Sequence, residues 1–363
     1  MRDDDPRALV YRPGSLGDTL VAMPAIQEIR RQYPAHRLTL LTERQAMASG
    51  RVSAWTILKE TGWFDEGHGY TVKPAGAGDV ARNLALALRL RSRGFDRVFS
   101  LAPPRTTRQL RNDALIFQRV VGARHYHAAA TAWPSSSGHA NHGPVEHEGL
   151  RLLRIVAPLA GSEALDNFRL SVPQADQERA RVLVTELGLG PGDVLVAVGP
   201  GSGRPTTAWP AERFAAVGHA LLQQFPNVAL LAIGGAHERE LCERLCAGWG
   251  PRAHNLAGTL GVFGSAAMLA RCVTFIGNDS GPVHLAAMTG VRCVAIFSAR
   301  NALGHWEPVG GHHIVLEERP ECAGCMLDEC LHEAYKCLTR IEVGAVVRAA
   351  VSLIEARRTC IAV

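Results

Sequence analysis

The sequence has no apolar run that approaches the roughly 20 residues needed to cross a bilayer. Its first residues, MRDDDPRALVYR, are acidic and lack the apolar stretch of a secretory signal. Lysine and arginine are dispersed, unlike the basic runs of nucleic-acid-binding chains, although the formal net charge is +5. We therefore expect a cytoplasmic protein without a nucleic-acid partner, at most in peripheral contact with the inner membrane face.

Aromatic residues are also scarce, at 6%, whereas alanine, leucine, valine and glycine are abundant. Small side chains around glycine turns favour an α/β protein over an all-β one. The 363 residues predict two domains, at about 100–200 residues each. Nine cysteines are present, but the count is odd and we expect the chain to stay in the reducing cytosol, which argues against disulfides.

Short β-rich runs alternate with helical runs twice along the chain, a rhythm typical of parallel sheets with helices on both faces. The predicted strands are Ala8–Arg12, Arg37–Thr42, Val98–Ala102, Asp193–Pro200, Val228–Gly235, Val273–Asp279 and Arg292–Ser298. We predict an α/β fold with two Rossmann-like, doubly wound lobes, residues 1–170 and 171–363, that face a central cleft. Whether a C-terminal helix at about 341–358 crosses back to the first lobe stays open.

Ligands of such sheets bind beyond the carboxyl ends of the strands, and the first motif, RPGSLGD, directly follows the first strand. Its glycines let the chain turn sharply and present backbone N–H groups to a ligand. Asp18, which ends the motif, is either the N-cap of the following helix or a general base beside the turn.

The second motif, GPGSGRPTTAWP, runs from Gly199 to Pro210 after the first strand of the second lobe. It combines turn glycines with the hydroxyl groups of Ser202 and Thr207 and the guanidinium group of Arg204. These groups are the parts of a phosphate cradle, and we favour that interpretation over a plain surface turn before a helix.

The third motif, GNDSGPVH, is a strand end that leads into a helix. Asp279 and Ser280 can cap this helix, and its N-terminus at Gly281 favours an anion such as a pyrophosphate. His284 is then either a structural histidine or a donor to that phosphate. A weaker fourth signal is Glu238, because an acidic residue just beyond a strand-end turn either holds ribose hydroxyls or simply favours a helix start.

Two clusters of a single residue type stand apart from these motifs. Four cysteines within 16 residues have the spacing of ligands for a structural zinc or iron, or else form a reduced, partly buried loop: Cys322, Cys325, Cys330 and Cys337. Three arginines at a spacing of three can share one helix face, which is either solvated or in contact with acidic sugars or phosphates of a ligand: Arg105, Arg108 and Arg111.

The order and spacing of the first three motifs resemble glycosyltransferase family 9, the ADP-heptose heptosyltransferases of lipopolysaccharide core synthesis. The most specific parts are RPGSLGDTLVAMPAIQEIR, the Trp209–Pro210 pair and GNDSGPVHLAA. The resemblance implies a GT-B fold and an inverting, metal-independent transfer of a heptose from a nucleotide sugar, with ADP-heptose as the donor, to a hydroxyl of an anionic lipopolysaccharide-core acceptor. It also implies that a metal at the cysteines would brace a loop rather than catalyse, since the family's mechanism needs no metal; a related branch is similar in using four cysteines to hold iron.

The resemblance also assigns roles to single residues. Asp18 matches the family's catalytic base, and the arginine cluster lies in the N-terminal lobe, where the family's acceptor binds. The positions that match the family's donor-binding residues are Asp279, Ser280, Gly281 and His284, and less firmly Ser202. One departure is Thr207, because family members typically carry a donor-phosphate lysine two residues before the Trp–Pro pair; Arg204 is the candidate replacement.

Two alternatives stay open. The missing lysine favours the same fold and mechanism with a different nucleotide sugar and a protein or secondary-metabolite acceptor. The other alternative is a non-catalytic binding protein with a decayed donor site, and the presence of Asp18, Asp279 and His284 argues against it.

Overall fold

The computed structural model describes residues 5–44, 52–129, 144–331 and 333–361. The chain divides into two compact units: unit 1 comprises Met1–Ser137 and Glu146–Leu165, and unit 2 comprises Gly138–Val145 and Asp166–Val363. Each unit is built on its own parallel sheet with helices on both faces, which confirms the predicted α/β class with two doubly wound lobes. Within the described ranges, no helix combines the length and apolar character that crossing a membrane requires.

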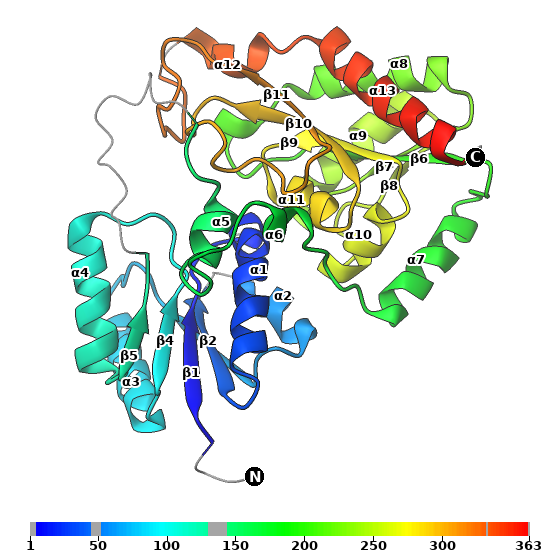
Figure 1. The fold of residues 1–363 in the computed structure, drawn as a ribbon. Coiled ribbons are helices and arrows are strands. Elements are labelled where there is room, and N and C mark those ends of the chain that lie inside the picture. Colours follow the sequence, from blue (N-terminus) through cyan, green and yellow to red (C-terminus); the bar gives the residue numbers. More distant parts are fainter. Residues whose placement is uncertain (1–4, 45–51, 130–143, 332, 362–363) are drawn as a thin grey trace. The chain divides into compact units, whose positions relative to one another are not determined.

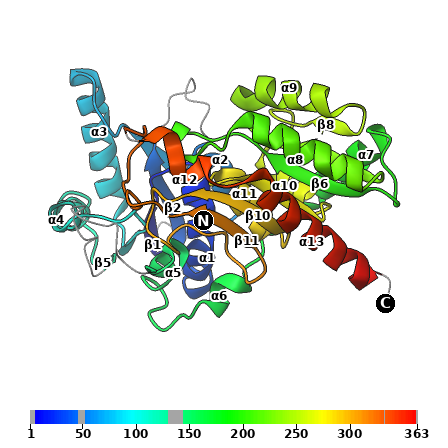
Figure 2. The ribbon, with the colours of Figure 1, turned by 90° about the horizontal axis from the view of Figure 1, so that it is seen from above.

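Unit 1 holds a five-stranded parallel sheet in the order β3-β2-β1-β4-β5. Its strands are β1 (Arg7–Tyr11), β2 (Arg37–Glu43), β3 (Glu66–Tyr70), β4 (Arg97–Ser100) and β5 (His125–His127). Its helices are α1 (Leu16–Gln32), α2 (Ala54–Leu58), α3 (Ala77–Arg93), α4 (Thr107–Leu115), α5 (Glu148–Leu153) and α6 (Glu163–Asp166), the last of which ends at the unit boundary. Helices α1 and α2 cover one face of the sheet, and α3 and α4 cover the other (Figures 1 and 2). The central strands β1 and β2 are therefore buried on both faces.

Unit 2 holds a six-stranded parallel sheet in the order β11-β10-β9-β6-β7-β8. Its strands are β6 (Val194–Gly199), β7 (Val228–Ala232), β8 (Ala253–Asn255), β9 (Thr274–Asn278), β10 (Arg292–Ser298) and β11 (Ile314–Glu318). Its helices are α7 (Gln174–Glu186), α8 (Ala211–Gln224), α9 (Arg239–Trp249), α10 (Val262–Leu269), α11 (Gly281–Met288), α12 (Lys336–Thr339) and α13 (Val343–Ile361). Figure 1 shows α8, α9 and α13 on one face of this sheet and α10 and α11 on the other.

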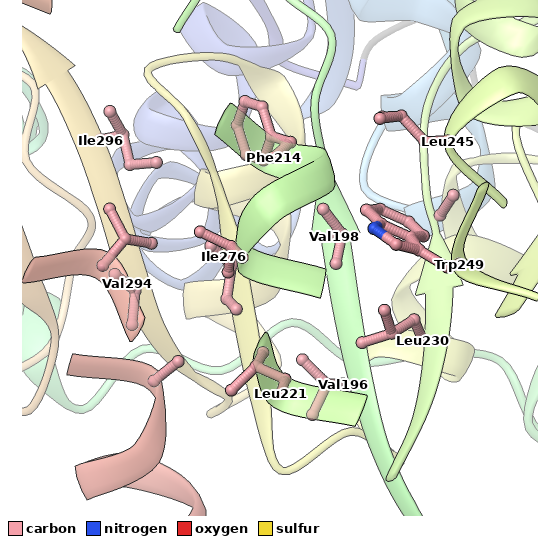
Figure 3. Packing of buried hydrophobic residues seen from close by; sticks show 14 of the residues in the cluster. Val196, Val198, Phe214, Leu221, Leu230, Leu245, Trp249, Ile276, Val294 and Ile296 are labelled. Atoms are coloured by element: carbon pink, nitrogen blue, oxygen red, sulfur yellow. The ribbon is translucent and has the colours of Figure 1, made fainter. Parts of the chain in front are cut away.

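The core of unit 2 lies between the sheet and α8, α9 and α13. Alternate strand residues point into it and meet two helices (Figure 3): Val196, Val198, Leu230, Ile276, Val294 and Ile296 from the strands, and Phe214, Leu221, Leu245 and Trp249 from α8 and α9. Helix α13 adds Val346, Ala350 and Ile354 to the same core, so its buried face packs within unit 2. Each such side chain contributes roughly 1.5–3 kcal/mol when it is fully removed from water. This packing fixes the carboxyl ends of the strands, where the chemically active loops begin.

In both sheets the chemistry-bearing segments follow those carboxyl ends. In unit 1 the turn to Asp18 follows β1. In unit 2, residues 200–207 follow β6, residues 236–238 follow β7, Asp279 follows β9 and Arg300 follows β10. Parallel strands place all of their carboxyl ends at one edge, so each sheet gathers its polar loops there.

Candidate active site

In unit 1, the turn between β1 and α1 depends on Gly14. Its φ of +122° lies in the region that favours glycine, and a Cβ built there would be 2.6 Å from Cβ of Asp18. Any side chain at this position would displace the aspartate. The glycine therefore lets the chain turn so tightly that Asp18 returns to the end of β1.

The carboxylate of Asp18 is held in place by Ser15. Its Oδ2 accepts a hydrogen bond from the backbone N–H of Ser15 at 2.8 Å and another from the Ser15 hydroxyl at 2.9 Å. Ser15, not Asp18, is the N-cap of α1, so the N-cap interpretation of Asp18 is wrong and the aspartate sits at the third helical position. Because 27% of its side chain remains exposed, the carboxylate is both oriented and open to a ligand.

Arg12 lies directly beneath this carboxylate, and the sequence interpretation missed it. The side chain is fully buried, and its two Nη atoms donate to the carbonyl oxygens of Leu101 and Asp18, each at 2.5 Å. Burial lowers the pKa of the guanidinium group, and the negative charges of Asp18 and Glu148 oppose that shift. Arg12 Nη2 also lies 3.7 Å from Asp18 Oδ1, so a buried cation compensates the charge of the aspartate.

The three arginines of the predicted cluster, Arg105, Arg108 and Arg111, do not share one helix face. Arg105 precedes α4, and its side chain turns inward: Nη2 donates to the Tyr11 hydroxyl at 3.0 Å, and Nε lies 3.3 Å from Oδ2 of Asp113. Arg108 and Arg111 lie on α4 itself and are exposed. Of the three, only Arg108 and Arg111 therefore lie on one helix face as their spacing predicted.

In unit 2, Asn278 ties two motifs together. The side chain, at the end of β9, is fully buried; Nδ2 donates to the carbonyl of Pro200 at 2.8 Å, and Oδ1 accepts from the backbone N–H of Trp209 at 3.0 Å. The indole of Trp209 is buried in turn and donates to the carbonyl of Ile341 at 3.2 Å. The glycine-rich loop is therefore anchored at both of its ends.

Between those anchors, the loop presents the predicted polar groups side by side. The hydroxyls of Ser202 and Thr207 are 2.6 Å apart, and Thr207 is only 4% exposed. Arg204 is more exposed, and its Nε lies 2.8 Å from Oδ1 of Asp328. The structure thus brings these three residues of the second motif together.

Glu238 lies against the same loop. A Cβ at Gly201 would be 1.8 Å from Oε1 of Glu238, so the carboxylate rests directly on the glycine backbone. Its Oε2 accepts from the backbone N–H of Gly235 at 2.7 Å, which fixes its direction. Glu238, the weakest of the four signals in the sequence, therefore contacts the glycine-rich loop that is the candidate phosphate cradle.

Asp279 is the third residue of the third motif, and its pKa is shifted far from the ordinary value for an aspartate. The half-buried carboxyl accepts a hydrogen bond from Nδ2 of Asn301 at 3.3 Å. Removal from water raises its pKa to about 7, although the cations Arg300 and Arg204 act in the opposite direction. A carboxyl with this pKa is partly protonated at neutral pH and can donate as well as accept hydrogen bonds.

The N-terminus of α11 carries no side-chain cap. Ser280 is at the N-cap position, but its hydroxyl donates back to the carbonyl of Asn278 at 3.4 Å instead of capping the helix. The first-turn N–H groups after Gly281 are therefore not occupied by the Ser280 side chain. His284 is 3% exposed and lies edge-on to Trp306, with ring centroids 6.4 Å apart.

Arg300 is the second residue that the sequence interpretation missed. It is 9% exposed; its Nε donates to the carbonyl of Leu327 and its Nη2 to the carbonyl of Met326, both at 2.9 Å. Nη2 also lies 3.3 Å from Oδ1 of Asp328, the same oxygen that pairs with Arg204. Two guanidinium groups therefore converge on one carboxylate oxygen beside the phosphate-loop candidate.

The four cysteines line one small cavity of about 20 Å³ next to Arg300 and Thr206: Cys322, Cys325, Cys330 and Cys337. Cys325 is exposed whereas the other three are half-buried, and all four are free thiols. Burial is the main reason that the pKa of the Cys337 thiol is raised. Nowhere in the described ranges do three or more histidine, cysteine or acidic side chains have the arrangement of metal ligands. The described residues therefore give no support to the predicted structural zinc or iron, although all four thiols line the same cavity.

These contacts give two chemically distinct groups of residues. Unit 1 presents an oriented, partly exposed carboxylate above a buried cation, which suits proton abstraction from a hydroxyl. Unit 2 presents hydroxyls, two arginines and the N-terminus of α11, which suit a diphosphate, with Glu238 nearby for hydroxyl groups.

Comparisons with known proteins point in one direction. A model of glycosyltransferase family 9 (heptosyltransferase) matches residues 119–336. Lipopolysaccharide heptosyltransferase 3 of Escherichia coli K12 is 24% identical over 294 residues, which cover 80% of this chain and 82% of that protein. A family 9 glycosyltransferase structure from Veillonella parvula is 21% identical with a TM-score of 0.71, covering 98% of this chain and 99% of that one. The structure of E. coli ADP-heptose lipopolysaccharide heptosyltransferase II is 16% identical with a TM-score of 0.66, covering 97% and 99%.

Proposed function

The chain belongs to glycosyltransferase family 9, with the GT-B fold of its heptosyltransferases, and from that premise we propose that it transfers a heptose from ADP-heptose to a hydroxyl of a lipopolysaccharide-core acceptor. Heptosyltransferase-type glycosyl transfer follows from the family, and the donor, the acceptor and the stereochemistry are our proposal. The observation that carries it is the Asp18 carboxylate, oriented by two hydrogen bonds from Ser15 and still open to a ligand.

In the proposed reaction, Asp18 is the general base. It takes the proton from the acceptor hydroxyl while the hydroxyl oxygen forms a bond to the anomeric carbon of the heptose. The bond from that carbon to the diphosphate oxygen breaks, and ADP leaves with the electron pair. A single displacement of this kind inverts the anomeric configuration. The buried charge of Arg12 supports the ionised carboxylate before the proton arrives.

The proposed donor site is the polar cluster of unit 2. Arg204 and Arg300 supply the positive charge for the departing diphosphate that the family's usual lysine would supply at Thr207. The N-terminus of α11 and the hydroxyls of Ser202 and Thr207 donate further hydrogen bonds. Glu238 rests on the same loop, and we assign it to the ribose hydroxyls.

For the acceptor we propose an anionic glycan or glycolipid, with Arg108 and Arg111 as its exposed cations. We propose that the protein acts on this acceptor at the cytoplasmic face of the inner membrane. Arg105 is held between Tyr11 and Asp113, so we assign it to the architecture of unit 1.

One observation favours a second donor. Thr207 and its hydroxyl pair replace the lysine, so the diphosphate contacts differ from the family pattern and the sugar contacts can differ too. Calorimetric titration with ADP-heptose, UDP-glucose, UDP-N-acetylglucosamine and GDP-mannose separates the two cases. Selective binding of ADP-heptose is the expected result, and selective binding of another donor would replace the proposed substrate while retaining the mechanism.

A further inference from the structure

A cavity of about 430 Å³ opens in unit 2 at the edge of the sheet opposite to the candidate donor site. Val273 precedes β9, Arg292 begins β10 and His313 precedes β11, and all three residues line the cavity. These strands are parallel, so the cavity lies at their amino ends. Asp279 and Arg300 follow the carboxyl ends of β9 and β10, which makes the two places distinct.

The charged side chains that line the cavity are all positive. Arg169, Arg292, Arg357 and His312 line it, and no aspartate or glutamate is among the lining residues. The guanidinium groups of Arg292 and Arg357 form no hydrogen bond or ion pair with any residue that the structure describes. Among the residues that the structure describes, Arg169 donates to two backbone carbonyls, those of Asp166 and Phe168, at 2.6 and 2.7 Å. Three permanent positive charges therefore line one space, and the nearby carboxylate of Asp166, which acts on His313, is not among the lining residues that the structure describes.

Two residues of the cavity wall have defined positions: His313 is fixed by two hydrogen bonds and Gly310 by its backbone conformation. Nδ1 of His313 accepts from the backbone N–H of Cys293 at 3.1 Å, so its proton is on Nε2, which donates to the carbonyl of Val309 at 2.8 Å. Burial lowers the pKa of His313, so this ring is a neutral wall and not a source of charge. Gly310 has a φ of +117°, and a Cβ there would be 2.9 Å from Nε2 of His313. The loop before β11 is therefore shaped by a glycine that no other residue can replace without strain.

The rest of the lining is apolar, with Val273, Ala287, Val309 and Ala356 on it. A volume of about 430 Å³ lies within the range of small-molecule sites, roughly 300–1,000 Å³, and far exceeds what a bare phosphate ion needs. Guanidinium groups bind phosphate oxygens in pairs with good geometry. We propose that this cavity binds a phosphate-bearing sugar or lipid headgroup, with its phosphate on Arg169, Arg292 and Arg357 and its body on the apolar wall.

Hydrogen exchange measured by mass spectrometry on the full chain tests this, because it reports protection segment by segment. Inorganic pyrophosphate and glucose 6-phosphate are the soluble probes, and phosphatidylcholine vesicles that contain phosphatidic acid are the membrane probe. Protection of residues 309–313 by the soluble probes identifies a free phosphorylated ligand, and protection by the vesicles alone identifies a lipid headgroup. No protection of residues 309–313 by any of them at millimolar phosphate would overturn the proposal. Protection of residues 200–207 reports the donor site separately, so this result does not depend on the proposed function.

A matched pair of variants locates the binding. The double variant R292Q/R357Q is expected to raise the probe concentration for half-maximal protection of residues 309–313 by at least about tenfold, since each charged hydrogen bond contributes about 1.5–3 kcal/mol. R348Q is the control, because Arg348 is an exposed arginine on the same helix as Arg357 and does not line the cavity. R357Q alone, at an exposed position of α13, is the fallback if the double variant has a lower Tm than wild type. Equal protection in wild type and in the arginine variants would also contradict the proposal.

Discussion

The hydroxyl of Ser202 lies 2.6 Å from the hydroxyl of Thr207, so a neutral pair stands where family members typically carry a lysine. Thr207 is only 4% exposed, and the positive charge nearby comes from Arg204 and Arg300. The family pattern and this chain thus place their cations differently around the same loop. If Arg204 and Arg300 supply the charge that the lysine supplies in other members, a lysine at position 207 should bring no gain in donor binding. If that charge has simply been lost, it should.

We predict that T207K does not improve donor binding. The new ammonium group would break the hydroxyl pair, enter a buried position and add a third cation beside two arginines. Titration with ADP-heptose should give unchanged or weaker affinity, and thermal melting should give a lower Tm. T207V, which keeps the shape but removes the hydroxyl, is the control. A tenfold gain in affinity on adding the lysine would show that the arginines do not replace it.

Arg300 gives the second prediction. R300Q should weaken donor binding by about ten- to a hundredfold, the equivalent of one charged hydrogen bond of about 1.5–3 kcal/mol. R300K should restore little of this, because a single ammonium group cannot donate to Leu327, Met326 and Asp328 in the geometry of the guanidinium. Calorimetric titration measures both variants. The control is R244Q on the exposed face of α9, and donor affinity of R300Q equal to that control would refute the assignment.

The raised pKa of Asp279 gives a prediction about stability. The folded protein holds this proton up to about pH 7, whereas an unfolded chain releases it near the ordinary value of 3.8. Between these values the folded state binds more protons than the unfolded state, so the aspartate costs the fold more as pH rises from 4 to 7. D279N removes that cost, and its Tm minus that of wild type should grow from near zero at pH 4 to several degrees at pH 8. A difference that is constant with pH would contradict the shifted pKa.

The same titration should appear in donor binding. A protonated Asp279 can donate to a phosphate oxygen, and an ionised one repels it, so affinity for the donor should fall as pH rises from 6 to 8. The asparagine of D279N does not titrate over that range, so the donor affinity of this variant should change less with pH. Titrations of both proteins at three pH values measure this. An identical slope for wild type and D279N would place the pH dependence on another group.

Gly14 gives a prediction about the geometry of the base. G14A should reduce turnover by at least about a hundredfold, because its Cβ would lie 2.6 Å from Cβ of Asp18 and push the carboxylate out of place. G62A is the matched control: Gly62 also has a positive φ, of +69°, but no atom lies within 4 Å of the added Cβ. That control should cost only about 1–2 kcal/mol of stability. Similar turnover in G14A and G62A would mean that catalysis does not depend on where the Asp18 carboxylate lies.

The sequence predicted the central strands well and missed the outer ones. Every predicted strand exists with its ends shifted by at most a few residues, because buried central strands read as continuous apolar runs. The unpredicted strands are the four edges of the two sheets: β3, β5, β8 and β11. All four are only partly buried; β3, β5 and β8 (EGHGY, HYH and AHN) carry little apolar signal, whereas β11 (IVLEE) has only a short apolar start. Their pairing comes from neighbouring strands, which local pattern cannot reveal.

The candidate site was predicted in the same uneven way. Turn glycines and helix starts mark Asp18, Ser202 and Asp279 locally. Arg12 and Arg300 were missed because each comes within two residues of the end of a buried strand with no motif that marks it as a site residue, and only the fold shows that the arginine is buried against a site. The cysteine spacing allowed either a metal site or a reduced loop; the fold brings all four cysteines to one cavity, but spacing along the chain does not fix where the sulfur atoms point, and the described residues give no support to a metal.

The most direct test of the account is a transfer assay with ADP-heptose and a heptose-containing lipopolysaccharide-core acceptor, followed by mass spectrometry of the acceptor. We predict that the wild-type protein adds one heptose and that D18N, which keeps the shape of the side chain but cannot take a proton, is slower by at least about a hundredfold. Donor affinity of D18N should match wild type, since the donor cluster lies in unit 2, whereas its Tm should fall because the buried Arg12 loses a compensating charge. Equal turnover by D18N, or no heptose transfer by a wild-type protein that binds ADP-heptose, would contradict the central claim.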